Sequence, residues 1–114
     1  MSAARLAARI EATALMRLAE ARGGSAALLH RGHAEAGTIL VYLADRGAFF
    51  GLFERLLQAD SRYRWTKVGP QDVENSEALN TYIRGRTRID PDLWVVELDI
   101  AGVERFAAEM IATG

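Results

Sequence analysis

Hydrophobic and polar residues follow a helical period at the start of the chain. From Ala3 to Arg22, apolar side chains recur as they do in an amphipathic helix that covers a core. The predicted buried stripe consists of Leu6, Ile10, Ala14 and Leu18, with Ala3, Ala7 and Ala21 beside them. Leu15 and Met16 lie off this stripe and offer a second contact side. Gly23 and Gly24 end the helix.

From residue 25 the pattern changes to short apolar runs. The run over 38–44 lacks polar alternation, which is typical of a strand buried on both faces. Residues 48–58 fit a helix or a strand, but Gly51 favours a strand because an interior glycine costs a helix about 1 kcal/mol. Residues 62–68 alternate strongly. With 26–30, these runs predict four strands in an antiparallel meander.

The last part of the chain predicts two helices around one strand. Residues 72–88 carry acids early and arginines late, the distribution that the helix dipole favours. Pro91 ends this helix, and a strand is predicted over 93–98 and a short helix over 102–112. The order α-β-β-β-β-α-β-α indicates an α+β fold. We expect a single domain, 1–114, with an antiparallel sheet of about five strands and helices packed on one face.

Composition narrows the function classes. The chain has 114 residues, half of them hydrophobic, with a net charge of −1 and no cysteine. The absence of cysteine excludes disulfides, thiolate metal sites and cysteine catalysis. The net charge near zero argues against a protein that coats nucleic acid with a basic surface. No apolar run approaches 18 residues, so no membrane-spanning helix is predicted. The acids in the first helix argue against a transit peptide, and we expect a cytoplasmic bacterial protein.

The segment Arg86–Glu97, which reads Arg-Thr-Arg-Ile-Asp-Pro-Asp-Leu-Trp-Val-Val-Glu, resembles the hallmark of a small alphaproteobacterial family, domain of unknown function 1491. The similarity extends to the opening helix and to the loop that begins Arg31-Gly32. It implies a compact α+β domain in the bacterial cytoplasm, with no assigned activity, cofactor or catalytic residue. Two features depart from the family pattern: His33 stands where aspartate is common, and a helical pattern follows where a strand-like tail is expected.

Two groups of side chains are candidates for reactive sites. His30, His33 and Glu35 lack the second ligand pair of a closed zinc site, so the sequence predicts no metal and no cofactor. Carboxylates crowd the hallmark, but no nucleophile or histidine accompanies them. A turn that caps amides and pairs with arginines is the favoured interpretation. The hallmark residues expected to be structural are Asp90, Pro91, Asp92, Leu93, Trp94 and Glu97.

One basic and aromatic segment suggests a ligand or nucleic-acid patch. Trp65 follows Arg62 and Arg64 and precedes Lys67 on the fourth strand, and single-stranded nucleic-acid binders stack bases on such aromatic rings. The candidate residues are Arg62, Arg64, Trp65, Arg84, Arg86 and Arg88. Strand alternation argues against the patch, because Tyr63, Trp65 and Lys67 face one way and the arginines the other.

The favoured function is a non-catalytic interaction or adaptor domain capable of self-association. The reason is a surplus of large apolar residues beyond what one helical layer can cover: Phe49, Phe50, Phe53, Leu56, Leu57, Leu15 and Met16. The expected partner is a protein or a second copy of the chain, without a membrane. The alternative is a weak single-stranded nucleic-acid binder that uses the basic-aromatic strand and the arginine cluster.

Overall fold

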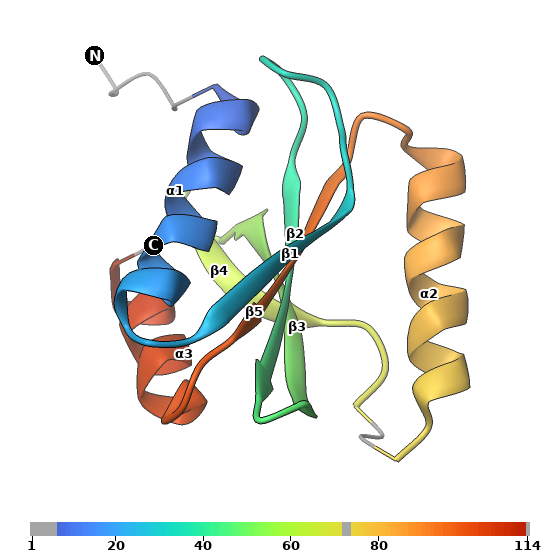
Figure 1. Ribbon diagram of the computed structural model, residues 1–114. Helices are drawn as coiled ribbons and strands as arrows, with labels where there is room; N and C mark the ends of the chain where they lie inside the picture. The colour runs from blue at the N-terminus through green and yellow to red at the C-terminus, as the bar shows by residue number, and fades with distance from the viewer. Residues whose placement is uncertain (1–6, 72–73, 114) are drawn as a thin grey trace.

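The computed structural model describes residues 7–71 and 74–113. The elements follow the predicted order α-β-β-β-β-α-β-α, which confirms the α+β class (Figure 1). They are α1 Ala8–Ala21, β1 Ser25–His30, β2 Ile39–Asp45, β3 Ala48–Leu57, β4 Tyr63–Val68, α2 Ser76–Ile89, β5 Trp94–Asp99 and α3 Val103–Thr113. The ambiguous segment 48–58 is a strand, and the chain after β5 is helical, as its apolar spacing predicted.

The five strands form one sheet in the order β1-β5-β2-β3-β4. The predicted four-strand meander is therefore wrong at its first strand, because β5 lies between β1 and β2. β2 and β5 are parallel, and the other neighbours are antiparallel. A parallel pair needs a long crossover connection. Here that connection consists of β3, β4 and α2.

Helices cover both faces of the sheet, not one face as the sequence suggested (Figure 1). On β5, Trp94 and Val96 face the core beneath α1 and α3, whereas Val95 faces the core beneath α2. β2 alternates in the same way, so the central parallel pair is buried on both sides. A strand without polar alternation needs apolar cover on both faces, which a single helical layer cannot provide.

The buried side of α1 differs from the predicted stripe. Ile10 and Leu18 are 45% and 42% exposed, and Ala14 is exposed as well. Ala8, Ala12 and Ala19 face the sheet instead, and Leu15 and Met16 pack against the core beside them. The predicted stripe members Ala3 and Leu6 lie outside the described residues.

A charged residue on the buried side explains this error. Glu11 lies among the inward-facing alanines and forms an ion pair with Arg55 of β3. Pairing offsets much of the cost of removing a carboxylate from water. A polar residue in the inward stripe hides the true period from a purely hydrophobic pattern.

The second helix begins later than predicted. α2 starts at Ser76 rather than at position 72, and residues 72–73 lie outside the described residues. The side-chain oxygen of Asn75 accepts a hydrogen bond of 2.9 Å from the amide of Ala78. This contact is an N-cap, and it fixes the first turn of the helix.

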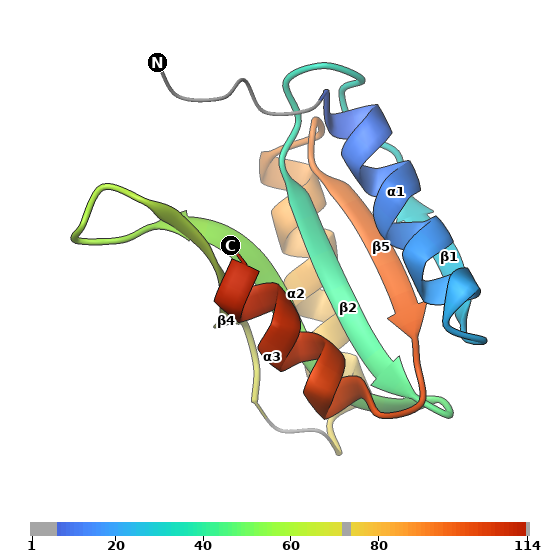
Figure 2. The same ribbon diagram turned by 90° about the vertical axis from the view of Figure 1, so that its left-hand side faces the viewer.

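α1 and α3 lie side by side on one face, and the β3–β4 hairpin extends past the sheet beyond them (Figure 2). In the part of the chain that the structure describes, no helix is long and apolar enough to cross a bilayer.

Candidate functional site

Trp65, the aromatic centre of the predicted patch, lies inside the protein. Its side chain is 4% exposed in the core beneath α1 and α3. The guanidinium carbon of Arg55 lies 4.5 Å from its ring centroid, a cation–π arrangement. The ring is not available for stacking a base in this structure.

The arginines of α2 lie on the opposite face of the sheet from the Trp65 ring. Arg86 donates two hydrogen bonds, of 2.9 and 2.8 Å, to the carboxylate of Glu54, and a third of 3.2 Å to the hydroxyl of Tyr82. The hydrogen bonds that the Glu54 carboxylate accepts hold the pKa of Arg86 well above its ordinary value. Arg84 and Arg88 are exposed on the same helix. The structure therefore separates this cluster from Trp65.

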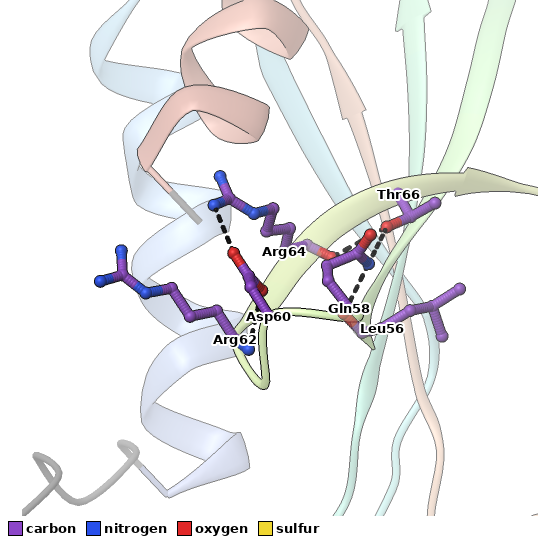
Figure 3. Close-up of polar contacts among 6 residues, drawn as sticks. All are labelled: Leu56, Gln58, Asp60, Arg62, Arg64 and Thr66. Carbon is purple, nitrogen blue, oxygen red and sulfur yellow. Dashed lines mark hydrogen bonds and ion pairs between the residues drawn. The ribbon is translucent and has the colours of Figure 1, made fainter.

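Arg62 and Arg64 lie at the end of the hairpin formed by β3 and β4, which we call the arm (Figure 3). The carboxylate of Asp60 accepts a hydrogen bond of 3.0 Å from the amide of Arg62 and one of 3.1 Å from the Arg64 guanidinium. The hydrogen bond from the Arg62 amide, and after it the one from the Arg64 guanidinium, holds the pKa of Asp60 below its usual range. The Arg64 guanidinium and the main chain of Arg62 are thus both bonded to the turn.

The side chain of Gln58 also stabilises the end of the arm, through hydrogen bonds to both of its strands. Its side-chain amide donates to the carbonyl of Leu56 at 2.9 Å and to the hydroxyl of Thr66 at 3.3 Å (Figure 3). A hairpin end braced in this way presents its side chains in a fixed arrangement, which lowers the entropy lost on binding.

The outer edge of β4 carries unpaired backbone groups. Among the described residues, no strand lies beyond β4. The amide of Gln58 donates to the carbonyl of Arg62, so this pair is hydrogen bonded. Because bonded and non-bonded pairs alternate in an antiparallel ladder, the amides and carbonyls of Tyr63, Trp65 and Lys67 point outward.

Apolar side chains accompany this edge. Leu57 and Tyr63 are cross-strand partners at the arm end, 60% and 54% exposed. On α3, Glu109 points toward α1, where it pairs with Arg22. Ile111 is rotated about 200° from Glu109 around the helix, so it lies on the flank toward β4. Ile111 is also exposed. We call these three apolar residues, with the free backbone of β4, the arm edge.

The predicted apolar surplus divides into two groups. Phe53 is buried, and Phe49, Phe50, Leu15 and Met16 pack partly buried against the two cores. The remaining two, Leu56 and Leu57, are exposed at the arm end. Most of the surplus packs in the core beneath α1 and α3, Phe49 packs in the core beneath α2, and the arm keeps the rest. Sequence reasoning missed Tyr63 as an edge residue, because the place of the fifth strand in the sheet depends on contacts distant in sequence.

The comparisons with known proteins agree with this architecture. A family model described as "Protein of unknown function (DUF1491)" matches residues 6–108. The chain belongs to the DUF1491 family. The resemblance carried by residues 86–97 is thereby confirmed. No curated protein matches the chain.

Solved structures show the same fold. A crystal structure of a DUF1491 family protein from Caulobacter crescentus is 35% identical, with a TM-score of 0.72 over 82% of this chain and 86% of that chain. An NMR structure of a DUF1491 family protein from the same organism is 34% identical, with a TM-score of 0.73 over 87% and 89%. A solution structure of a protein from A. tumefaciens is 27% identical, with a TM-score of 0.64 over 84% and 86%.

The DUF1491 hallmark forms a turn that is hydrogen bonded to the loop between β1 and β2. A side-chain oxygen of Asp90 accepts a hydrogen bond of 3.1 Å from the amide of Asp92, a local contact that stabilises the turn around Pro91. The amide of His33 donates to the carbonyl of Asp92 at 3.0 Å, and the indole nitrogen of Trp94 donates to the carbonyl of His33 at 2.8 Å. Leu93 is fully buried beneath α2.

His30 and His33 both lie where the hallmark turn meets the loop between β1 and β2. Nδ1 of His30 lies 2.7 Å from the carbonyl oxygen of Leu93. Nδ1 of His33 accepts from the amides of Glu35 and Ala36 at 3.2 and 3.0 Å. Over the described residues, no group of three metal-ligating side chains is close enough to hold an ion.

Glu97 is half-buried on the α2 side of the sheet. Among the described residues it forms no ion pair, so the arginine pairing expected of the hallmark carboxylates does not extend to it. It is directly opposite Tyr42 in the parallel β2–β5 pair. Burial, and then the negative charge of Glu97, raise the pKa of the Tyr42 phenol. The centroid of the Tyr42 ring lies 5.0 Å from that of Phe49.

Two glycine substitutions test the contact between the loop and the hallmark. A Cβ atom on Gly32 would overlap the carbonyl of Asp92, so Gly32→Ala should lower the free energy of unfolding by about 2 kcal/mol. Gly85 lies inside α2 with open space around it, so Gly85→Ala should raise this free energy by about 1 kcal/mol. Urea denaturation measures both. Equal stability of the Gly32→Ala variant and the wild type would contradict the described contact.

The Tyr42 phenol provides a pH test. Its pKa is raised, so its contribution to stability is fully present below the ordinary value of about 10 and is lost as pH rises toward its folded-state pKa. Removing the adjacent charge with Glu97→Gln should lower the pKa of Tyr42. Phenolate absorbance measured against pH, with Tyr42→Phe as the assignment control, reports this change. An unchanged titration in Glu97→Gln would contradict the electrostatic cause.

Proposed function

We propose that this DUF1491 chain is a non-catalytic interaction domain that self-associates through the arm edge. The observation that carries the proposal is the combination of outward backbone groups on β4 with exposed Leu57, Tyr63 and Ile111 beside them. An open strand edge is a template for pairing with another strand. Apolar side chains next to such an edge add area that leaves water when pairing occurs.

A second copy of the same chain fits this edge because antiparallel pairing of identical strands is two-fold symmetric. A register that centres on Trp65 sets it against Trp65 of the partner subunit, and Tyr63 against Lys67 of the partner subunit. Both members of each pair point their backbone groups outward, so hydrogen bonds form across the axis. Tyr63 and Lys67 then meet as an aromatic ring and a cation.

Registers shifted by one residue fit poorly. Setting Trp65 against Thr66 would place outward groups opposite groups already bonded to β3. The same register would set Arg64 against Lys67, and like charges directly opposite each other destabilise a strand pair. Backbone direction and charge thus favour the same class of register.

Single-stranded nucleic-acid binding, the alternative, needs an accessible aromatic ring among unpaired arginines. Trp65 is buried, Arg86 is bound to Glu54, and Arg64 is bound to Asp60. These contacts support a structural role for the basic-aromatic strand. No observation favours the alternative over self-association.

The turn contacts of Asp90 and Asp92 support the non-catalytic part of the proposal. A carboxylate of Asp90 engages a backbone amide, and the main chain of Asp92 receives the loop from β1. Acid–base catalysis requires carboxyl groups positioned toward a substrate, commonly with a nucleophile or a histidine beside them.

Sedimentation velocity over a hundredfold range of concentration tests the proposal. We expect the wild type to pass from monomer to dimer, and Leu57→Asp to remain a monomer, because a buried unpaired carboxylate opposes association. Ile89→Asp is the matched control, since Ile89 is exposed at the end of α2 on the other face. The control should dimerise like the wild type.

Two results would overturn the proposal. One is a wild type that stays monomeric at every concentration. The other is a control variant that loses association as fully as Leu57→Asp does while both remain folded by circular dichroism.

A further inference from the structure

The outer side of α1 carries large apolar residues, although it faces away from the sheet. Ile10 and Leu18 are 45% and 42% exposed, and Ala14 between them is exposed as well. Residues four apart are rotated by about 40° around a helix, so these three share one side, which we call the α1 face. No described element lies over this face (Figure 2). A surface helix normally carries polar residues opposite its buried side.

The α1 face also has the shape of a packing site for a helix. A hollow of about 270 Å³ lies on it, lined by Arg9, Ile10, Thr13, Ala14 and Arg17. All of these except Arg9 stand at positions i, i+3, i+4 and i+7, the arrangement that forms a hole for a side chain of a facing helix. The side chain at the middle of the hollow is only a methyl group, so a facing helix can approach closely.

Charged side chains line one flank of the α1 face. Within the described residues, the side chains of Arg9, Arg17 and Glu20 form no ion pair. Arg9 and Glu20 are rotated by only about 20° from each other, so both lie on this flank. The flank therefore has a cation near the start of the helix and an acid near its end. Such a flank is complementary to a reversed copy of itself.

We infer that the α1 face is a second contact surface between copies of this chain, in which α1 packs antiparallel against α1 of the partner subunit. A two-fold axis at Ala14 sets Ile10 level with Leu18 of the partner subunit, so the exposed apolar residues cover each other. The same axis brings equal flanks together. Arg9 then lies about 1.5 Å along the helix axis from the level of Glu20 of the partner subunit.

Parallel packing of the two helices fits poorly. It would set Arg9 beside Arg9 of the partner subunit, and like charges that face each other across an interface oppose association. In the antiparallel arrangement, each Glu20 lies between two cations: Arg17, one turn earlier on its own helix, and Arg9 of the partner subunit. The charges therefore select the same direction that pairs the apolar residues.

The α1 contact is separate from the arm edge and weaker. α1 packs over β1 and β5, whereas β4 is at the other edge of the sheet. One pair of short helices buries less than the roughly 1,200 Å² at which stable interfaces begin. Leu57→Asp is therefore still expected to sediment as a monomer, and the α1 contact links copies only at high local concentration. A covalent trap is needed to detect it.

Cysteine trapping tests the contact, because the chain has no cysteine of its own. Ala14→Cys places two thiols at the two-fold axis, where close packing brings the Cα atoms within the about 7 Å that a disulfide spans. The matched control is Thr81→Cys, at an exposed position inside α2. Both are made in the Leu57→Asp background, which removes the arm contact, and also in the otherwise unchanged chain.

Denaturing electrophoresis during mild oxidation gives the rate of disulfide-linked dimer formation. We expect this rate to be about tenfold higher for Ala14→Cys than for Thr81→Cys in both backgrounds, because the contact raises the effective concentration of the thiols. The rate of alkylation by iodoacetamide corrects for differences in thiol reactivity.

A charge exchange tests the register. Glu20→Arg should slow the trapping of Ala14→Cys about threefold, because it sets a third cation beside Arg9 and Arg17. Adding Arg9→Glu restores opposite charges in reversed order and should recover the original rate. Arg9 and Glu20 are exposed helix residues, so these variants are expected to fold, and circular dichroism checks this.

Two results would overturn the inference. Equal corrected rates for Ala14→Cys and Thr81→Cys would show that copies do not meet at the α1 face. Trapping that Glu20→Arg does not slow, or that Arg9→Glu does not restore, would contradict the antiparallel register. Neither result bears on the arm edge, since the arm contact is absent from the Leu57→Asp background.

Discussion

The parallel pairing of β2 with β5 is the constraint from which the rest of this architecture follows. Both strands are apolar on both faces, so each face needs a helical layer: α1 and α3 on one side and α2 on the other. Parallel neighbours also need a long connection, and β3, β4 and α2 supply it. That connection extends the sheet outward through β3 and leaves β4 with a free edge. The surface proposed for self-association is thus a consequence of how the centre of the sheet is joined.

The hallmark turn also supports the pairing of β2 with β5, because it lies directly before β5. Residues 90–93 bring the chain back from α2 into β5, and the loop between β1 and β2 closes onto this turn through His33, Asp92 and Trp94. The Trp94 ring packs in the core beneath α1 and α3 and is only 3% exposed. The family signature therefore has a folding role: it returns the chain into the central strand β5 and binds the loop between β1 and β2.

Local patterns along the chain predicted the elements well, because helix period, strand alternation and breakers such as Pro91 act over a few residues. The pairing of β1 with β5 depends on contacts distant in sequence, and no local pattern encodes it. The double-sided burial of β2 was visible in its apolar run, and it already implied two helical layers. Glu11 hides the buried side of α1 from a hydrophobic pattern, since its ion pair with Arg55 places a charge on the inward side. The basic-aromatic patch failed for a related reason: the alternation that separates Trp65 from Arg64 is local, but the burial of Trp65 beneath α3 is tertiary.

Amide hydrogen exchange in β4, measured at low and at high protein concentration, tests the central claim most directly. The amides of Tyr63, Trp65 and Lys67 point outward, whereas those of Arg64, Thr66 and Val68 face β3. We expect exchange at the three outward amides to slow as concentration rises, while exchange at their three neighbours changes little. Outward amides that exchange at the same rate at every concentration would contradict self-association through this edge.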